Sequence, residues 1–130
     1  DSRREGASNM NRHIEQDCVR WEEDDGKLLF SITETLSGDT VTLSLSGTLS
    51  SVVAPAFEDE LMAAACVRSR IAVDFSGLQV ISSGGLKALL TVQRLLDQRP
   101  GSMLKLCAMS SAVHATFAEI GFDELFEIES

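Results

Sequence analysis

The chain has 130 residues, of which 44% are hydrophobic and 24% charged, so its length and composition fit one globular domain with a hydrophobic core. Its formal net charge of −9 argues against a nucleic-acid-binding protein, because a phosphate backbone requires clustered Lys and Arg. No apolar run approaches the roughly 20 residues of a membrane-spanning helix, so we expect no direct insertion into a membrane. Cys18, Cys66 and Cys107 are scattered without CxxC spacing, which indicates reduced thiols in a cytoplasmic protein.

Residues 1–27 form a polar N-terminal extension ahead of the main domain, residues 28–130. Its apolar residues Met10, Ile14, Cys18 and Trp21 follow 3- and 4-residue steps, which predicts a short helix that docks through one face. A flexible leader, derived in part from cloning, is the alternative. If the extension is ordered, we expect Trp21 to anchor it on the main domain.

The main domain shows alternating strand and helix patterns. Two alternating segments around Ser37-Gly38-Asp39 predict a β-hairpin, at residues 29–36 and 40–46. Helical spacing then predicts helices at residues 54–67, 84–98 and 111–120, and apolar runs predict strands at residues 70–75, 103–108 and 125–128. The order ββαβαβα(β) predicts an α/β fold: a mixed sheet covered by helices, with the functional site at the carboxyl ends of its strands.

Residues 82–85, Ser82-Ser83-Gly84-Gly85, lie where the strand from residue 70 leads into the second helix, and we name them the serine–glycine corner. Both serines are good helix N-caps, so capping alone is one interpretation. Two glycines in a first helical turn each cost about 0.5–1 kcal/mol relative to Ala. We therefore expect that another molecule's backbone approaches the corner closely, which favours a modified or partner-contacting serine.

Two other uses of the corner fit less well. A phosphate-binding loop requires a GxxxxGK[ST] or GxGxxG run, and a serine hydrolase requires GxSxG, whereas this segment reads ISSGG. His114 is the only histidine of the main domain, and we interpret it as a surface or helix-cap residue. Metal ligands at useful spacing are absent from the sequence. We therefore expect a protein without a catalytic site, cofactor or metal.

Three segments together carry a family resemblance: SGTLSSVVAPAFEDEL, IAVDFSGLQVISSGGLKALL and LKLCAMSSAVHATFAEIGFDELFEI. They resemble a STAS domain, most closely the bacterial anti-sigma factor antagonists, over about residues 28 to 130. In that family the serine before the small-residue pair at the helix start accepts phosphate, and this resemblance implies that Ser83 is the phosphoacceptor. The sequence departs from the usual pattern at Ser82 and Ser50, where the family commonly has Asp.

The resemblance implies a phosphorylation-controlled binding switch that regulates transcription or another output. Unphosphorylated, the protein would bind and sequester an anti-sigma factor with a GHKL-type serine kinase domain, and a PP2C-like phosphatase would reset it. We expect the partner to contact a surface that comprises Ser50, Ser51, Ser82, Gly84, Gly85 and Lys87. The alternatives are a non-phosphorylated STAS scaffold, as in an ABC lipid transporter or a stressosome-like assembly, and a small-ligand sensor.

Overall fold

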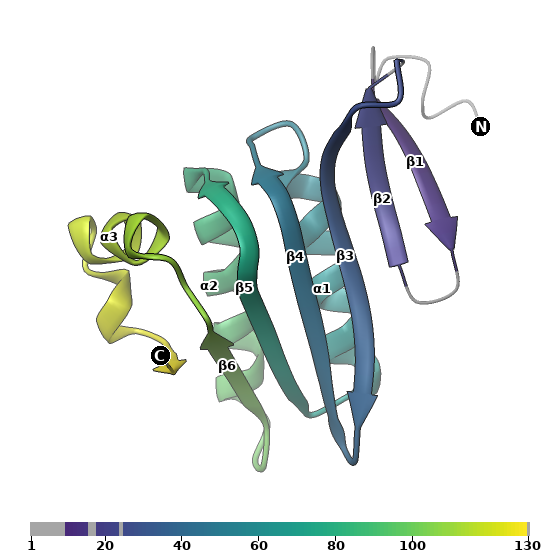
Figure 1. Ribbon diagram of the computed structural model, residues 1–130. Helices are drawn as coiled ribbons and strands as arrows, with labels where there is room; N and C mark the ends of the chain where they lie inside the picture. The colour runs from purple at the N-terminus through teal and green to yellow at the C-terminus, as the bar shows by residue number, and fades with distance from the viewer. Residues whose placement is uncertain (1–9, 16–17, 24, 130) are drawn as a thin grey trace.

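The computed structural model describes residues 10–15, 18–23 and 25–129, and within them one mixed sheet holds seven strands in sequence order (Figure 1). The strands are β1 (Met10–Glu15), β2 (Cys18–Glu23), β3 (Leu28–Ser37), β4 (Thr40–Leu49), β5 (Arg70–Ile81), β6 (Met103–Cys107) and β7 (Glu127–Glu129). The helices of this part are α1 (Ala54–Val67), α2 (Ser83–Asp97), α3 (Ser111–Glu119) and the 3₁₀ helix η2 (Phe122–Glu124).

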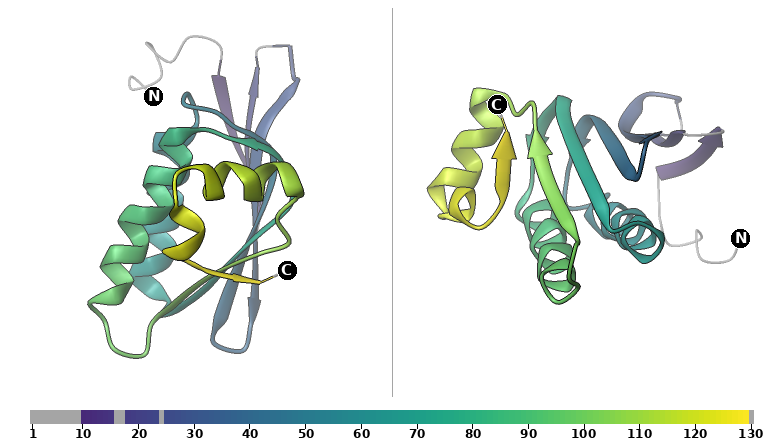
Figure 2. Two further views of the ribbon diagram at one scale, coloured as in Figure 1. Left: turned by 90° about the vertical axis from the view of Figure 1, so that its left-hand side faces the viewer. Right: turned by 90° about the horizontal axis from the view of Figure 1, so that it is seen from below.

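The sheet is antiparallel from β1 to β4 and parallel from β4 to β7. The parallel crossovers β4–α1–β5 and β5–α2–β6 both advance in the same direction along the sheet. Because such crossovers are right-handed, both helices lie on the same face of the sheet. Figures 1 and 2 show α1 and α2 side by side on that face, with α3 beyond β5 near the C-terminus. The predicted α/β fold with a mixed, helix-covered sheet is confirmed.

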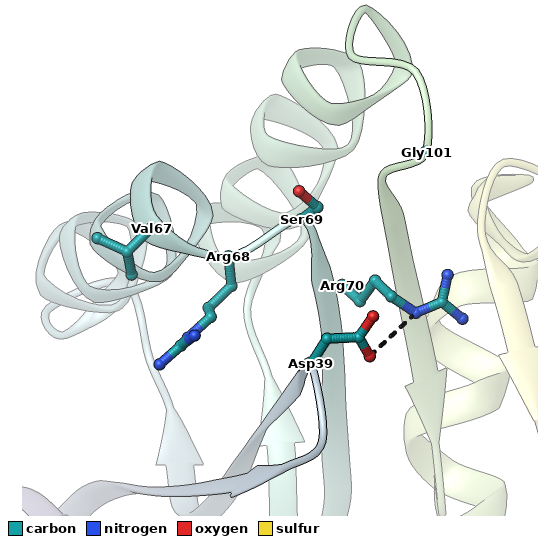
Figure 3. A pocket seen from close by; sticks show the side chains of 6 residues that line it. All are labelled: Asp39, Val67, Arg68, Ser69, Arg70 and Gly101. Carbon is teal, nitrogen blue, oxygen red and sulfur yellow. Dashed lines mark ion pairs between the residues drawn. The ribbon is translucent and has the colours of Figure 1, made fainter.

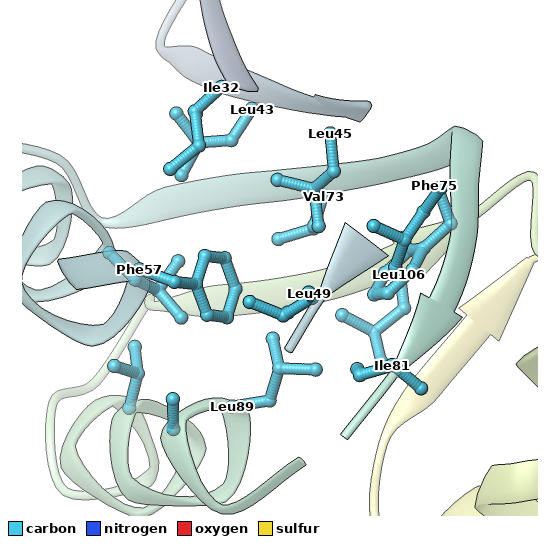
Figure 4. Packing of buried hydrophobic residues seen from close by; sticks show 14 of the residues in the cluster. Ile32, Leu43, Leu45, Leu49, Phe57, Val73, Phe75, Ile81, Leu89 and Leu106 are labelled. Atoms are coloured by element: carbon cyan, nitrogen blue, oxygen red, sulfur yellow. The ribbon is translucent and has the colours of Figure 1, made fainter. Parts of the chain in front are cut away.

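The core lies between the sheet and the pair α1 and α2. Alternate residues of β4 point into it, and the apolar stripes of both helices close it from the other side (Figure 4). Of the leucines of α2, Leu86, Leu89 and Leu96 are buried, and Leu90 is half-buried. The described helices include none that is long and apolar enough to cross a membrane.

The predicted short helix in the N-terminal extension is wrong. Residues 10–15 and 18–23 form the antiparallel strands β1 and β2, which continue the sheet beyond β3. Trp21 does anchor them: its side chain is 1% exposed and stacks on Phe30 with 5.6 Å between ring centroids, and Phe30 meets Phe57 of α1 edge to face. An ion pair of 2.8 Å from Arg12 to Glu60 also joins β1 to α1. Residues 1–9 of the predicted extension lie outside the described residues.

Several element boundaries differ from the prediction. Strand β5 runs on to Ile81 instead of ending near residue 75, because its second half pairs with the end of β4 after a register shift. The third helix ends at Glu119, one residue earlier than predicted, and Ile120, its C-cap residue, is 52% exposed. Gly121 then turns the chain at a φ of 77° into η2, so the last strand is shorter than expected and begins at Glu127.

Candidate functional site

Ser82 caps helix α2. Its backbone is extended, and its hydroxyl oxygen accepts a hydrogen bond from the Gly85 N–H at 3.3 Å. Its carbonyl accepts the N–H of Leu86 at 3.1 Å, the first bond of the helix. The Ser82 side chain is half-buried and therefore engaged in holding the helix start.

Ser83 is the first residue of α2, and its side chain is exposed. Among the described residues its hydroxyl has no hydrogen-bond partner, so nothing in this part of the chain competes for it. At this position the hydroxyl lies beside the unpaired N–H groups and the positive end of the helix dipole, where an added negative charge is stabilised. The two adjacent serines thus differ: Ser82 is engaged within the fold, and Ser83 is available.

The two glycines of the corner face neighbouring side chains of the same domain at different distances. A Cβ on Gly85 would lie 2.7 Å from Cδ2 and 2.8 Å from Cγ of Leu49, and 3.0 Å from Cγ1 of Ile81. A Cβ on Gly84 would lie 3.0 Å from the Cβ of Ala54 at the start of α1. Internal contact therefore accounts for Gly85, and not, as we expected, the approach of a partner's backbone, whereas a small shift of Ala54 would make room for a side chain at Gly84. Gly85 is buried, which removes it from the surface that a partner can reach, whereas Gly84 is half-buried.

The loop between β4 and α1, residues 50–53, lies directly beside the corner. Leu49 pairs with Ile81 in the parallel ladder, and the Ser82 N–H donates to the Leu49 carbonyl at 2.8 Å. This brings the half-buried Ser50 and the exposed Ser51 to the same end of the sheet as Ser83.

Two valines near the corner were missed by the sequence analysis. Val52, in the β4–α1 loop, is 64% exposed, and Val80, the next-to-last residue of β5, is 55% exposed. A surface that combines exposed apolar side chains with hydroxyl groups is better suited to protein contact than a purely polar surface is. The sequence did not indicate that these valines are exposed, because valine in an apolar strand or before a helix is expected to be buried.

Lys87 is exposed and lies four residues after Ser83, so the two side chains share one face of α2. Helix α2 has no acidic residue in its first turn. The local charge that faces Ser83 from its own helix is therefore positive, in a chain whose net charge is −9.

The remaining chemical candidates do not join this site. His114 is exposed on α3, whose N-cap is Ser110, with its hydroxyl oxygen accepting the Val113 N–H at 3.1 Å. In the part of the chain that the structure describes, no three His, Cys, Asp or Glu side chains are grouped as a metal site would require. Burial and then the carboxylates of Asp74 and Glu129 raise the pKa of the Cys107 thiol, which makes it less reactive.

Comparison with known proteins places the fold. The chain is similar to an anti-sigma factor antagonist from Mycobacterium paratuberculosis, with 23% identity and a TM-score of 0.69 over 76% of this chain and 84% of that one. It is also similar to the anti-sigma factor antagonist SpoIIAA in its unphosphorylated form, with 20% identity and a TM-score of 0.63 over 76% of this chain and 88% of that one. The Bacillus cell fate determinant SpoIIAA in the phosphorylated form matches with 19% identity and a TM-score of 0.59, over 76% and 91% of the two chains.

These likenesses concern the fold, and no functionally curated protein matches the sequence significantly. Residues 32–127 match the family model described as "Mlab, STAS domain", which spans most of the chain. The chain belongs to the STAS domain family.

Proposed function

We propose that this protein is a phosphorylation-controlled binding switch of the anti-sigma factor antagonist type, with Ser83 as the phosphoacceptor. The observation that carries the proposal is the exposed hydroxyl of Ser83 at the first position of α2, beside a neighbouring serine that already caps the helix. The fold supports it, because structures of anti-sigma factor antagonists share it, and one of them, SpoIIAA, is known in unphosphorylated and phosphorylated forms.

In the unmodified state a partner docks on the end of the sheet where the corner meets the β4–α1 loop. Val52 and Val80 provide apolar area there, and Ser51 and Ser83 provide exposed hydroxyls that can hydrogen-bond to the partner. The proposed partner is an anti-sigma factor with a GHKL-type serine kinase domain, whose sequestration would release a sigma factor or another client.

Phosphorylation then changes the charge of this surface by about −1.5 to −2 at neutral pH. Inside the domain the new charge is tolerated, because the N-terminus of α2 and the nearby Lys87 both stabilise it. In the complex the same charge is removed from water without a matching partner, which costs several kcal/mol, and each 1.4 kcal/mol or so lowers the affinity tenfold. Release follows, and a PP2C-like phosphatase would restore binding.

Labelling by kinases from the same cell, followed by mass spectrometry of residues 71–94, tests the acceptor. We expect phosphate on Ser83 and none in the Ser83→Ala variant. Phosphate on Ser82 alone would identify Ser82 as the acceptor and contradict the geometric argument. If neither serine is labelled, the protein is a non-phosphorylated STAS scaffold instead. The departure from the usual Asp at Ser50 and Ser82 would be consistent with that result.

Calorimetry with the labelling kinase as the partner tests the switch itself. Ser83→Asp should lower the affinity at least tenfold, and Ser83→Ala should preserve it. Ser111→Asp is the matched control, because Ser111 is likewise an exposed first residue of a helix whose preceding serine is the cap. Both Asp variants should fold with stability within about 1 kcal/mol of the parent, since a carboxylate at a helix N-terminus is neutral to favourable. Equal affinities of the two Ser83 variants would show that charge at Ser83 is not the switch.

A further inference from the structure

A pocket of about 400 Å³ lies at the end of the sheet opposite the serine–glycine corner (Figure 3). Three loops line it: the β3–β4 turn with Asp39, the α1–β5 connection from Val67 to Arg70, and the α2–β6 connection with Gly101. Ser83 follows the carboxyl end of β5 and the pocket lies at its amino end, so the 12 residues of this strand separate them by roughly 36 Å. The pocket is therefore independent of the proposed switch surface.

The positive charge of this pocket stands out in so acidic a chain. The whole chain has 20 acidic and 11 basic residues, yet two arginines and one aspartate line the pocket. The one ion pair there joins Nε of Arg70 to Oδ1 of Asp39 at 3.8 Å, and the Asp39 side chain is 84% exposed, so the pairing is weak. Among the described residues no carboxylate pairs with Arg68, whose side chain extends to the other side of Asp39 (Figure 3).

The backbone under these arginines is held rigidly. The Met103 N–H donates to the Ser69 carbonyl at 2.8 Å, and Thr40, Arg70 and Met103 lie side by side in the parallel ladder. Arg99 donates to the carbonyl of Ala65 near the end of α1, which ties the two helix–strand connections together. A ligand would thus find the floor of the pocket preformed and would need to order only exposed side chains.

We propose that this pocket binds a phosphate group, either free or as a monoester of a small molecule. The lining is polar apart from Val67, which excludes an apolar ligand. The planar guanidinium groups of Arg68 and Arg70 lie on either side of Asp39, and both side chains are exposed, so both can turn toward one doubly charged oxyanion (Figure 3). The bound anion replaces Asp39 as the counterion of Arg70.

The test is an NMR titration of the ¹⁵N-labelled full chain with inorganic phosphate and, separately, with phenyl phosphate, at constant ionic strength. We expect saturable shifts of the amides of residues 39, 67–70 and 101. Arg68→Ala and Arg70→Ala should each weaken binding at least tenfold, whereas Asp39→Asn should strengthen it severalfold, because a competing carboxylate is removed. Tighter binding of phenyl phosphate would identify a monoester as the ligand, and equal binding would identify the free anion.

Arg94→Ala is the matched control, because Arg94 is an exposed arginine of α2 outside the pocket lining and its loss should leave the titration unchanged. Shifts that do not saturate, that chloride reproduces, or that persist in the two arginine variants would overturn the proposal. All of the substituted side chains are exposed, and the dispersion of the amide spectrum confirms folding in each variant. Labelling of Ser83 should be unaffected by these changes, so failure of this proposal and failure of the switch are separate results.

Discussion

Substitution of Gly85 by Ala separates internal packing from partner binding as the reason for glycine in the serine–glycine corner. The new Cβ would lie 2.7 Å from Cδ2 and 2.8 Å from Cγ of Leu49, whose side chain is fully buried. Overpacking of a filled core costs about 1–3 kcal/mol, and replacing glycine in a helix returns about 0.5–1 kcal/mol. We therefore expect a net loss of up to about 2.5 kcal/mol in the free energy of unfolding.

Urea denaturation of the parent and of Gly85→Ala measures this loss, provided that the slope of the unfolding free energy against urea concentration is the same for both proteins. Gly84→Ala is the control, since its one tight contact is with the Cβ of Ala54, at 3.0 Å, and a shift of a few tenths of an ångström relieves it; the Ser82 Oγ lies at an ordinary contact distance of 3.7 Å. Its stability should stay close to that of the parent. If Gly85→Ala were as stable as the parent and instead lost partner affinity, then the glycine would serve the partner, and the packing argument would be refuted.

Three further predictions concern single side chains. Trp21→Ala should lower the free energy of unfolding by about 3–5 kcal/mol, because a fully buried indole that stacks on Phe30 is lost; a change below 1 kcal/mol in urea denaturation would show that β1 and β2 do not stabilise the domain. Ser82→Ala should lower it by about 0.5–2 kcal/mol through loss of the cap, and Ser83→Ala should be nearly neutral; equal losses would contradict the division between the two serines. Alkylation of Cys107 by iodoacetamide, followed by mass spectrometry, should require a higher pH than alkylation of the exposed Cys66, because the raised pKa of Cys107 lowers its thiolate fraction; faster reaction at Cys107 would exclude this cause.

The sequence predicted the elements whose pattern is local. The hairpin around Gly38 and the helix from Ala54 to Val67 occur as expected, because alternation, helical spacing and a proline in the first helical turn each describe a short segment by itself. The start of a helix at the serine–glycine corner followed in the same way, because the apolar strand pattern gives way to helical spacing there.

The errors concern features that distant residues decide. Strand β2 exists because Trp21 and its neighbours pair with β3, and spacing within residues 10–21 suited a helix equally well. The second half of β5 is a strand because β4 continues beside it. For Gly85 the sequence showed that a side chain was not tolerated, but not whether the obstacle was another molecule or Leu49 of the same chain.

The contacts that position Ser83 come from the β4 side of strand β5 and not from the β6 side. Strand β6 pairs with residues 70–74 of β5, and beyond them no described strand pairs with β5 on that side. The contacts that hold the corner come instead from β4 and α1: the hydrogen bond from Ser82 to Leu49, and the packing of Gly84 on Ala54 and of Gly85 on Leu49. The loop of residues 50–53 joins these two supports, Leu49 and Ala54, so a substitution there that disturbs their packing also displaces the hydroxyl. Partner affinities of variants in this loop therefore identify contact residues only where the free energy of unfolding is unchanged.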